Sequence, residues 1–85
     1  MNISHNPRFH PLMTDRMAET AALVALGKTN KEIASDLDVS VKTVEKFRQM
    51  IHDRFGARNT ADVTRLAIYL KLIDLHHSVQ IPTYA

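Results

Sequence analysis

The chain has 85 residues, of which 11 are Lys or Arg and 9 are Asp or Glu, so its formal net charge is +2. Its length is enough for one domain and excludes two, and the absence of cysteine excludes disulfides and thiolate zinc sites. The longest nearly apolar stretch, residues 21–26, is far too short to span a bilayer. The first residues contain no basic cluster followed by an apolar run, so no secretory signal is expected. These features predict a cytoplasmic protein without a membrane partner.

The positive charge is concentrated in one part of the chain. Residues 40–58 contain five basic and two acidic side chains, whereas the rest of the chain contains six basic and seven acidic ones. The basic side chains of this stretch are Lys42, Lys46, Arg48, Arg54 and Arg58. A local excess of positive charge makes nucleic acid the first partner to consider. The alternative is a solvated helix face that binds nothing.

The first predicted helix follows a short N-terminal tail, residues 1–12, in which Pro7 and Pro11 disfavour helix. Thr14 is a good N-cap, and Gly27 is suited to the left-handed position just beyond a helix end. The apolar stripe of this helix is expected to comprise Met17, Ala21 and Val24.

A second, shorter helix is predicted to begin at Thr29. Thr29 and Glu32 have the spacing of a capping box, in which each side chain bonds the free backbone N–H of the other residue. The apolar positions expected to pack inward are Ile33, Ala34 and Leu37. The residues Asp38-Val39-Ser40 that follow have the composition of a turn.

Ser40 is expected to cap a third helix from Val41 to about Phe55. One narrow apolar stripe of this helix is predicted to lie in the core, and it comprises Val44, Phe47, Ile51 and Phe55. The opposite face has long polar side chains, namely Lys42, Glu45, Lys46, Gln49 and Asp53, with Arg48 and Arg54 on the two flanks.

A fourth helix is predicted from a cap at Asn59 or Thr60 to about Ile73, and residues 76–85 are expected to be a C-terminal tail. Its core face comprises Val63, Leu66, Ala67 and Leu70. A second apolar face comprises Ile68, Leu72 and Leu75. A helix that is apolar on two sides has two partners. Strand signals are weak throughout, because no run of alternating β-branched residues is bounded by turn residues, so the sequence predicts an all-α fold.

The second and third helices, joined by a very short turn, have the sequence form of a helix-turn-helix. In this motif the second helix lies in the major groove of DNA, and only the outward residues near its start reach base edges. Those residues are Lys42, Glu45, Lys46 and Gln49. Lys46 can donate to guanine, Gln49 can pair with N6 and N7 of adenine, and Glu45 can accept from N4 of cytosine. Alternatively, Glu45 supports the helix by pairing with Gln49 or Arg48.

Residues 13–73 resemble the LuxR-type (GerE-like) helix-turn-helix domain of bacterial transcription regulators. The motifs responsible are Thr14-Asp15-Arg16, Gly27-Lys28-Thr29-Asn30-Lys31-Glu32-Ile33-Ala34, Leu37-Asp38-Val39-Ser40-Val41-Lys42-Thr43-Val44 and Ile51-His52-Asp53-Arg54-Phe55-Gly56. The resemblance implies a four-helix domain, residues 13–75, that binds DNA through its third helix and forms a homodimer through its fourth. It implies base contacts at the four positions above and phosphate contacts at Thr29, Asn30, Lys31, Thr43 and Arg48. It also implies a dimer interface at Ile68, Leu72 and Leu75.

The chain departs from the family pattern at a few positions. Phe47 replaces a histidine, Met17 and Ala18 occupy a first turn that is usually more acidic, and Ala21 replaces a larger apolar residue. We expect Phe47 to affect packing more than DNA recognition, and Ala21 to leave the core slightly thinner.

The sequence supports other classes of function less well than DNA binding. No catalytic group, cofactor or metal site is expected, since Ser40 is a cap and adjacent residues such as His76 and His77 point in different directions on a helix. The competing hypothesis is a protein-interaction module that binds and restrains another regulator through the Ile68 and Leu72 face. A further alternative is that this face contacts the two tails. The expected partners are double-stranded DNA and a second copy of the chain, with RNA polymerase or another regulator as further candidates.

Overall fold

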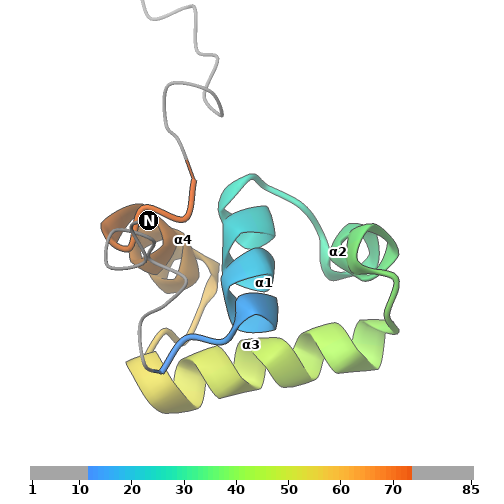
Figure 1. The fold of residues 1–85 in the computed structure, drawn as a ribbon, viewed down its shortest axis with the longest axis horizontal. Helices are drawn as coiled ribbons and strands as arrows, with labels where there is room; N and C mark the ends of the chain where they lie inside the picture. Colours follow the sequence, from blue (N-terminus) through green and yellow to red (C-terminus); the bar gives the residue numbers. More distant parts are fainter. Residues whose placement is uncertain (1–11, 74–85) are drawn as a thin grey trace, which may run out of the picture.

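The computed structural model describes residues 12–73, which form four helices and no strand, so the all-α prediction is confirmed. The helices are α1 (Asp15–Ala25), α2 (Asn30–Leu37), α3 (Val41–Phe55) and α4 (Thr60–Tyr69). α1 is central and contacts the other three helices. Figure 1 shows α2 and α4 on opposite sides of α1, with α3 crossing beneath it. No helix within the described residues is long and apolar enough to cross a membrane.

Each helix begins at a side chain that accepts a hydrogen bond from the first turn. Thr14 caps α1, Thr29 caps α2, Ser40 caps α3 and Asn59 caps α4. The capping box of α2 forms as predicted, because the hydroxyl of Thr29 accepts from the N–H of Glu32 at 3.1 Å and the Glu32 carboxylate accepts from the N–H of Thr29 at 2.8 Å. The predicted helix starts are therefore confirmed.

The helices end at residues in the left-handed conformation. Gly27 has φ +88° after α1, and Gly56 has φ +72° after α3, as expected for glycine. Two residues with a Cβ also adopt this conformation, Asp38 after α2 and Lys71 after α4, each with φ +58°.

The fourth helix is shorter than predicted and ends at Tyr69 instead of about Ile73. The reason is a Schellman motif, in which the N–H of Lys71 donates to the carbonyl of Ile68 at 3.0 Å and the N–H of Leu72 donates to the carbonyl of Ala67 at 2.8 Å. This turn removes Leu72 from the helix and directs it back towards the core.

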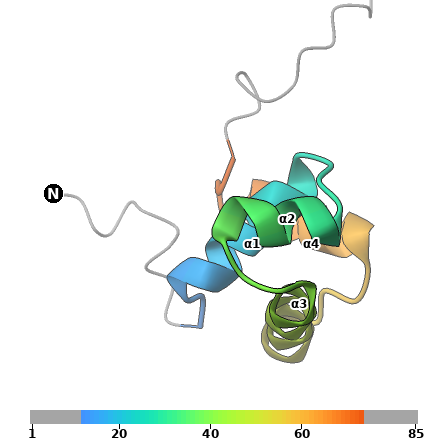
Figure 2. The same ribbon diagram turned by 90° about the vertical axis from the view of Figure 1, so that its right-hand side faces the viewer.

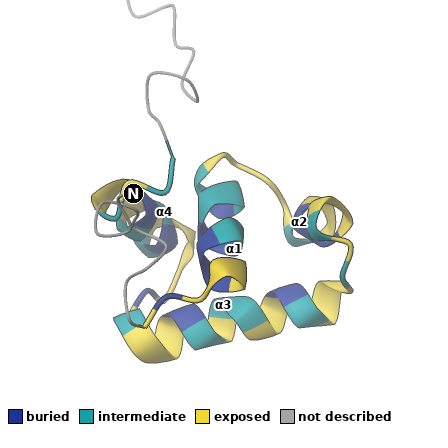
Figure 3. Cartoon of the chain, in the orientation of Figure 1, coloured by how far each residue is buried: buried dark blue, intermediate teal, exposed yellow. Residues whose placement is uncertain are grey.

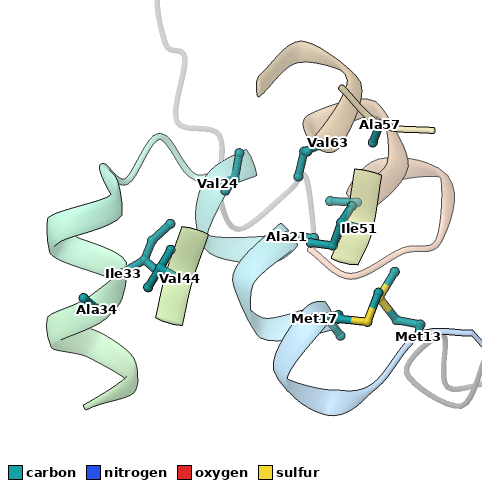
Figure 4. Packing of buried hydrophobic residues seen from close by; sticks show 12 residues of the cluster. Met13, Met17, Ala21, Val24, Ile33, Ala34, Val44, Ile51, Ala57 and Val63 are labelled. Atoms are coloured by element: carbon teal, nitrogen blue, oxygen red, sulfur yellow. The ribbon is translucent and has the colours of Figure 1, made fainter. Parts of the chain in front are cut away.

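The core lies between α1 and the other three helices. Every helix contributes fully or nearly fully buried apolar residues, and the principal ones are Met17, Ala21, Val24, Ile33, Ala34, Val44, Ile51, Val63 and Ala67. Figure 4 shows Ile33 of α2 next to Val44, and Ala21 of α1 next to Ile51. In Figure 3 the buried positions of α3 lie on the side that faces α1. The predicted stripes of α1, α2 and α4 are confirmed at these positions.

The prediction for Phe47 is wrong. Phe47 is only half-buried and is not one of the residues packed against the core. A step of three residues places it about 60° around the helix from Val44, at the edge of the stripe. Val44 and Ile51 fill the centre of the stripe, and both are fully buried. The expectation that Phe47 acts mainly through core packing is therefore not supported.

Two arginines connect segments that are distant in sequence. Arg16 of α1 donates to the carbonyl of Leu37 at the end of α2, at 3.3 Å. Arg54 of α3 donates to the carbonyl of Leu12 at 3.3 Å and contacts the sulfur of Met17 at 3.5 Å. Both contacts lie at the N-terminal end of α1, where they connect the end of α2 and the end of α3 to the central helix.

Candidate nucleic-acid interface

The outer face of α3 is polar and accessible. Lys42, Glu45, Lys46 and Gln49 are all exposed, as predicted. Figure 2, which looks along α3, shows this helix at the margin of the molecule with the other helices on one side of it. Within residues 12–73, the side chains of Lys42, Glu45 and Lys46 form no hydrogen bond or ion pair. These three side chains are therefore available to a partner.

Two surface hollows lie along the outer face of α3. The first lies between the start of α2, the middle of α3 and the start of α4, and it is lined by Asn30, Glu45, Arg48, Gln49, His52, Ala57, Arg58, Asn59 and Val63. The second lies at the start of α3 and is lined by Ser40, Lys42, Thr43, Glu45 and Lys46. The structure thus brings most of the predicted base- and phosphate-contacting residues to one continuous surface.

The start of α2 supplies polar groups beside this surface. The capping box uses the hydroxyl of Thr29 and the N–H of Glu32, so the N–H groups of Asn30 and Lys31 remain without an acceptor inside the helix. Free N–H groups and the helix dipole at such an end favour an anion. The Lys31 side chain is exposed and that of Asn30 is half-buried at the edge of the first hollow.

Arg48 and Thr43, both predicted to contact phosphate, have partners within the chain. The guanidinium of Arg48 donates to the hydroxyl of Thr60, the first residue of α4, at 3.1 Å. The hydroxyl of Thr43 lies 2.9 Å from that of Ser40, whose oxygen also accepts the N–H of Thr43 at 3.0 Å. Ser40 thus acts as the cap that the sequence predicts.

Gln49 is held by two neighbours on the same helix. Its amide nitrogen donates to Asp53 Oδ1 at 2.9 Å and lies 3.2 Å from His52 Nδ1. His52 Nδ1 is itself 3.4 Å from the same Asp53 oxygen. The alternative role considered for Glu45, pairing with Gln49 or Arg48, is therefore not seen, because both of those residues bond to other partners.

Sequence reasoning missed several residues of this surface. His52, Arg58 and Asn59 line the first hollow, although none was predicted to be a site residue. Arg58 belongs to the basic stretch, which was the available signal. Its backbone N–H donates to Asp62 at 3.1 Å, and this bond, together with the nearby Arg65 guanidinium, lowers the pKa of the Asp62 carboxyl below its ordinary value of 3.8.

The predicted dimer face is only partly formed as expected. Ile68 is exposed at 40%. Leu72 is half-buried and packs against the core of its own chain, because the Schellman turn directs it there, so its expected exposure is wrong. Leu75 lies outside the described residues. Tyr69, which sequence reasoning did not select, is exposed at 81% beside Ile68.

The sequence predicts no metal site, and candidate metal ligands can be located only within residues 12–73. Residues 12–73 contain no group of three His, Asp or Glu side chains placed to hold a metal ion. His76 and His77 lie outside the described residues.

Comparison with known proteins gives an independent result. The family model described as bacterial regulatory proteins, luxR family (GerE), matches residues 11–67. The C4-dicarboxylate transport transcriptional regulatory protein DctR of Rhodobacter capsulatus is 43% identical over 49 residues, which are 58% of this chain and 25% of DctR. The oxygen regulatory protein NreC of Staphylococcus aureus is 36% identical over 63 residues, which are 74% of this chain and 29% of NreC.

The chain thus spans less than a third of the length of these relatives. No solved structure gave a significant match. The family model covers most of the chain and the same residues that form the helix-turn-helix, so the chain belongs to the LuxR family of bacterial regulatory proteins.

Proposed function

We propose that this chain binds double-stranded DNA in a sequence-specific way, as the DNA-binding part of a bacterial transcription regulator that acts in the cytoplasm. The observation that supports this best is the outer face of α3. It presents Lys42, Glu45 and Lys46, all exposed and without a partner among the described residues, on a helix at the margin of the molecule. The major groove is about 12 Å wide and admits a helix presented in this way.

Phosphate contacts hold the helix in place. Thr29, Asn30 and Lys31 lie at the start of α2, where free N–H groups favour an anion, while Thr43 and Arg48 lie along α3. Lys42 and Lys46 add positive charge to the same surface. Glu45 opposes phosphate attraction, so its position on this face favours contact with base edges over nonspecific attachment.

The relatives support a regulatory role. DctR is called a transcriptional regulatory protein and NreC an oxygen regulatory protein. We propose that this chain likewise regulates transcription. The C4-dicarboxylate transport and the oxygen in the names of DctR and NreC describe those two proteins, and we assign neither to this chain.

We further propose that two copies pair through the outer face of α4. Ile68 is 40% exposed there, and burying this remaining part of the side chain contributes roughly 1 kcal/mol per copy. This is too little for a tight dimer, so pairing would be weak in solution and completed on DNA, where two half-sites align the copies.

The second candidate function is a protein-interaction module that binds another regulator or RNA polymerase. It is favoured by the exposure of two large side chains in succession, Ile68 and Tyr69. Such a module would bind DNA weakly and without sequence preference.

DNA selection from a random pool with the purified 85-residue chain separates the two functions. A DNA-binding dimer should enrich an inverted repeat, and its log K should fall with log salt concentration at a slope of about −5 or steeper. A folded protein that enriches nothing contradicts the DNA-binding proposal and favours the interaction module. Its partner would then be sought by pull-down.

A further inference from the structure

We propose that Asp53, together with His52, determines how Gln49 recognises a base: these two residues hold the amide nitrogen of Gln49, so its carbonyl oxygen is the group presented to DNA. The inference rests on the proposed binding of α3 in the major groove. It assigns a positioning role to two residues that have no base contact of their own in the proposal.

The chemistry of the contacts fixes the orientation of the Gln49 amide. A carboxylate can only accept a hydrogen bond, so the end of the amide that faces Asp53 Oδ1 at 2.9 Å must be the nitrogen. The same nitrogen lies 3.2 Å from His52 Nδ1, a second acceptor when this ring atom carries no proton. A primary amide has two N–H groups, and these two acceptors can occupy both.

The carbonyl oxygen of Gln49, unlike the amide nitrogen, has no hydrogen-bond partner among the described residues. Glu45, one turn earlier on the same face, does not compete for the amide nitrogen. Gln49 therefore presents an acceptor to the solvent side of α3 and keeps its donors on the helix surface.

This orientation changes the expected base preference. Only two bases offer a hydrogen-bond donor in the major groove, adenine through N6 and cytosine through N4. An oxygen presented by Gln49 accepts from either, whereas the oxygens of guanine and thymine repel it. Pairing with both N6 and N7 of adenine would need one N–H of Gln49, and these groups are held by Asp53 and, when its Nδ1 carries no proton, by His52. The expectation of bidentate adenine recognition is thus replaced by a preference for adenine and cytosine alike.

The contacts are exposed, so Asp53 shifts the preference without making it absolute. The Asp53 side chain is 62% exposed and that of His52 is 44% exposed. Removal of Asp53 should free an N–H of Gln49 for N7 of adenine, an acceptor that cytosine lacks. The ratio of adenine to cytosine affinity at this one position therefore reports the role of Asp53.

The test compares selected sites and affinities for the wild type, Asp53→Ala and Asp53→Glu. Gln49→Ala is used first to find the base position whose preference depends on Gln49. The wild type should bind sites with adenine or cytosine there within about threefold of each other, and Asp53→Ala should favour adenine by roughly tenfold or more. Asp53→Glu keeps a carboxylate within reach of Gln49 and should stay close to the wild type.

The ratio of adenine to cytosine affinity distinguishes a positioning role of Asp53 from an effect of its negative charge. Loss of a negative charge raises affinity for every sequence, so a purely electrostatic role of Asp53 would leave the ratio unchanged. Because His52 can retain the amide by itself, the double variant His52→Ala/Asp53→Ala is measured as well. A shift towards adenine in the single or the double variant, absent in Asp53→Glu, supports the proposal.

Three results overturn it: a wild type that already prefers adenine to cytosine by tenfold, a ratio unchanged in both the single and the double variant, or an equal shift in Asp53→Glu. If neither the wild type nor any variant enriches a DNA site, the proposed sequence-specific DNA binding is rejected, and the inference is rejected with it. Sequence-specific binding with an unmoved ratio rejects only the role of Asp53.

Discussion

Side chains that are close in sequence on α3 have different roles, one in the core and the other on the surface. Val44 is fully buried, whereas Lys46, two residues later, is exposed and unpaired among the described residues. Since successive residues are about 100° apart around a helix, a single turn of α3 supplies both core packing and part of the proposed DNA surface. Substitutions at these two positions should therefore affect different properties.

Lys46→Ala should weaken binding to the selected site by roughly 1–3 kcal/mol, because the proposed base contact is lost, and should leave the melting temperature almost unchanged. Titration of the selected site and thermal unfolding followed by circular dichroism measure the two effects. Loss of the folded state in Lys46→Ala would contradict its assignment to the surface.

Val44→Ala is the matched core variant on the same turn. It removes buried methyl groups from the contact with α2 and should lower the free energy of unfolding by about 1–3 kcal/mol. Urea unfolding measures this loss. A cost below about 0.5 kcal/mol would mean that the core around Val44 closes over the cavity.

Asp62 makes a pH-dependent contribution to stability. The pKa of its carboxyl is lowered by the hydrogen bond from the N–H of Arg58 and by Arg65, so the charged form is favoured in the folded state. A lowered folded pKa stabilises the protein above the ordinary aspartate pKa, and the gain is lost as the pH falls through the folded value. Asp62→Asn should lower the melting temperature at about pH 7, and its difference from the wild type should be smaller near pH 2. Equal differences at both pH values would rule out this linkage.

At the scale of the helices, the four C-terminal ends differ from one another in structure more than the four N-terminal ends do. The starts share one device, a polar cap, while the ends include two residues with a Cβ in the left-handed conformation. That conformation costs an ordinary L-residue roughly 1–2 kcal/mol, and less for aspartate, which bonds locally. Lys71 thus retains strain that Asp38 partly avoids.

Lys71→Gly should raise the free energy of unfolding by about 0.5–1 kcal/mol, because relief of the left-handed strain exceeds the added freedom of the unfolded chain. Lys71→Ala keeps the Cβ and serves as the control, with no comparable gain expected. Urea unfolding of the wild type, Lys71→Gly and Lys71→Ala measures the three free energies of unfolding. A gain in the alanine variant as large as in the glycine variant would point to the lysine charge instead.

These helix ends explain how far the sequence could predict the fold. Caps have specific side-chain chemistry and glycine marks a left-handed position, so three helices were predicted closely. Lysine carries no such signal, and the end of α4 at Tyr69 was therefore missed, together with the burial of Leu72. Likewise, Gln49 has a carboxylate one turn away in both directions, Glu45 and Asp53, and its choice of partner follows only from three-dimensional geometry.

At the scale of the whole molecule, the proposed DNA face and the proposed dimer face lie on different helices. α3 lies along one margin, and α4 lies on the side of α1 opposite α2 (Figure 1). Both surfaces can therefore be occupied at the same time, as a dimer on an inverted repeat requires.

Ile68→Glu should weaken binding to the inverted repeat by roughly tenfold or more, because each copy loses an apolar contact and gains a repulsive charge. Binding to a single half-site should be unaffected, and this is the control for the added charge. Both are measured by titration at one salt concentration. Equal losses on the two DNA molecules would exclude α4 as the dimer contact.

The bond between Arg48 and Thr60 has a consequence for the entropy of binding. A long cation normally loses rotational freedom when it contacts a phosphate, and this loss subtracts from affinity. Arg48 is already held at 3.1 Å from the Thr60 hydroxyl, and its guanidinium keeps further N–H groups for a ligand. Lys31 is exposed and unrestrained within the described chain, so it must lose this freedom on binding. Of these two proposed phosphate contacts, Arg48 is pre-ordered by the fold and Lys31 is ordered only by the DNA.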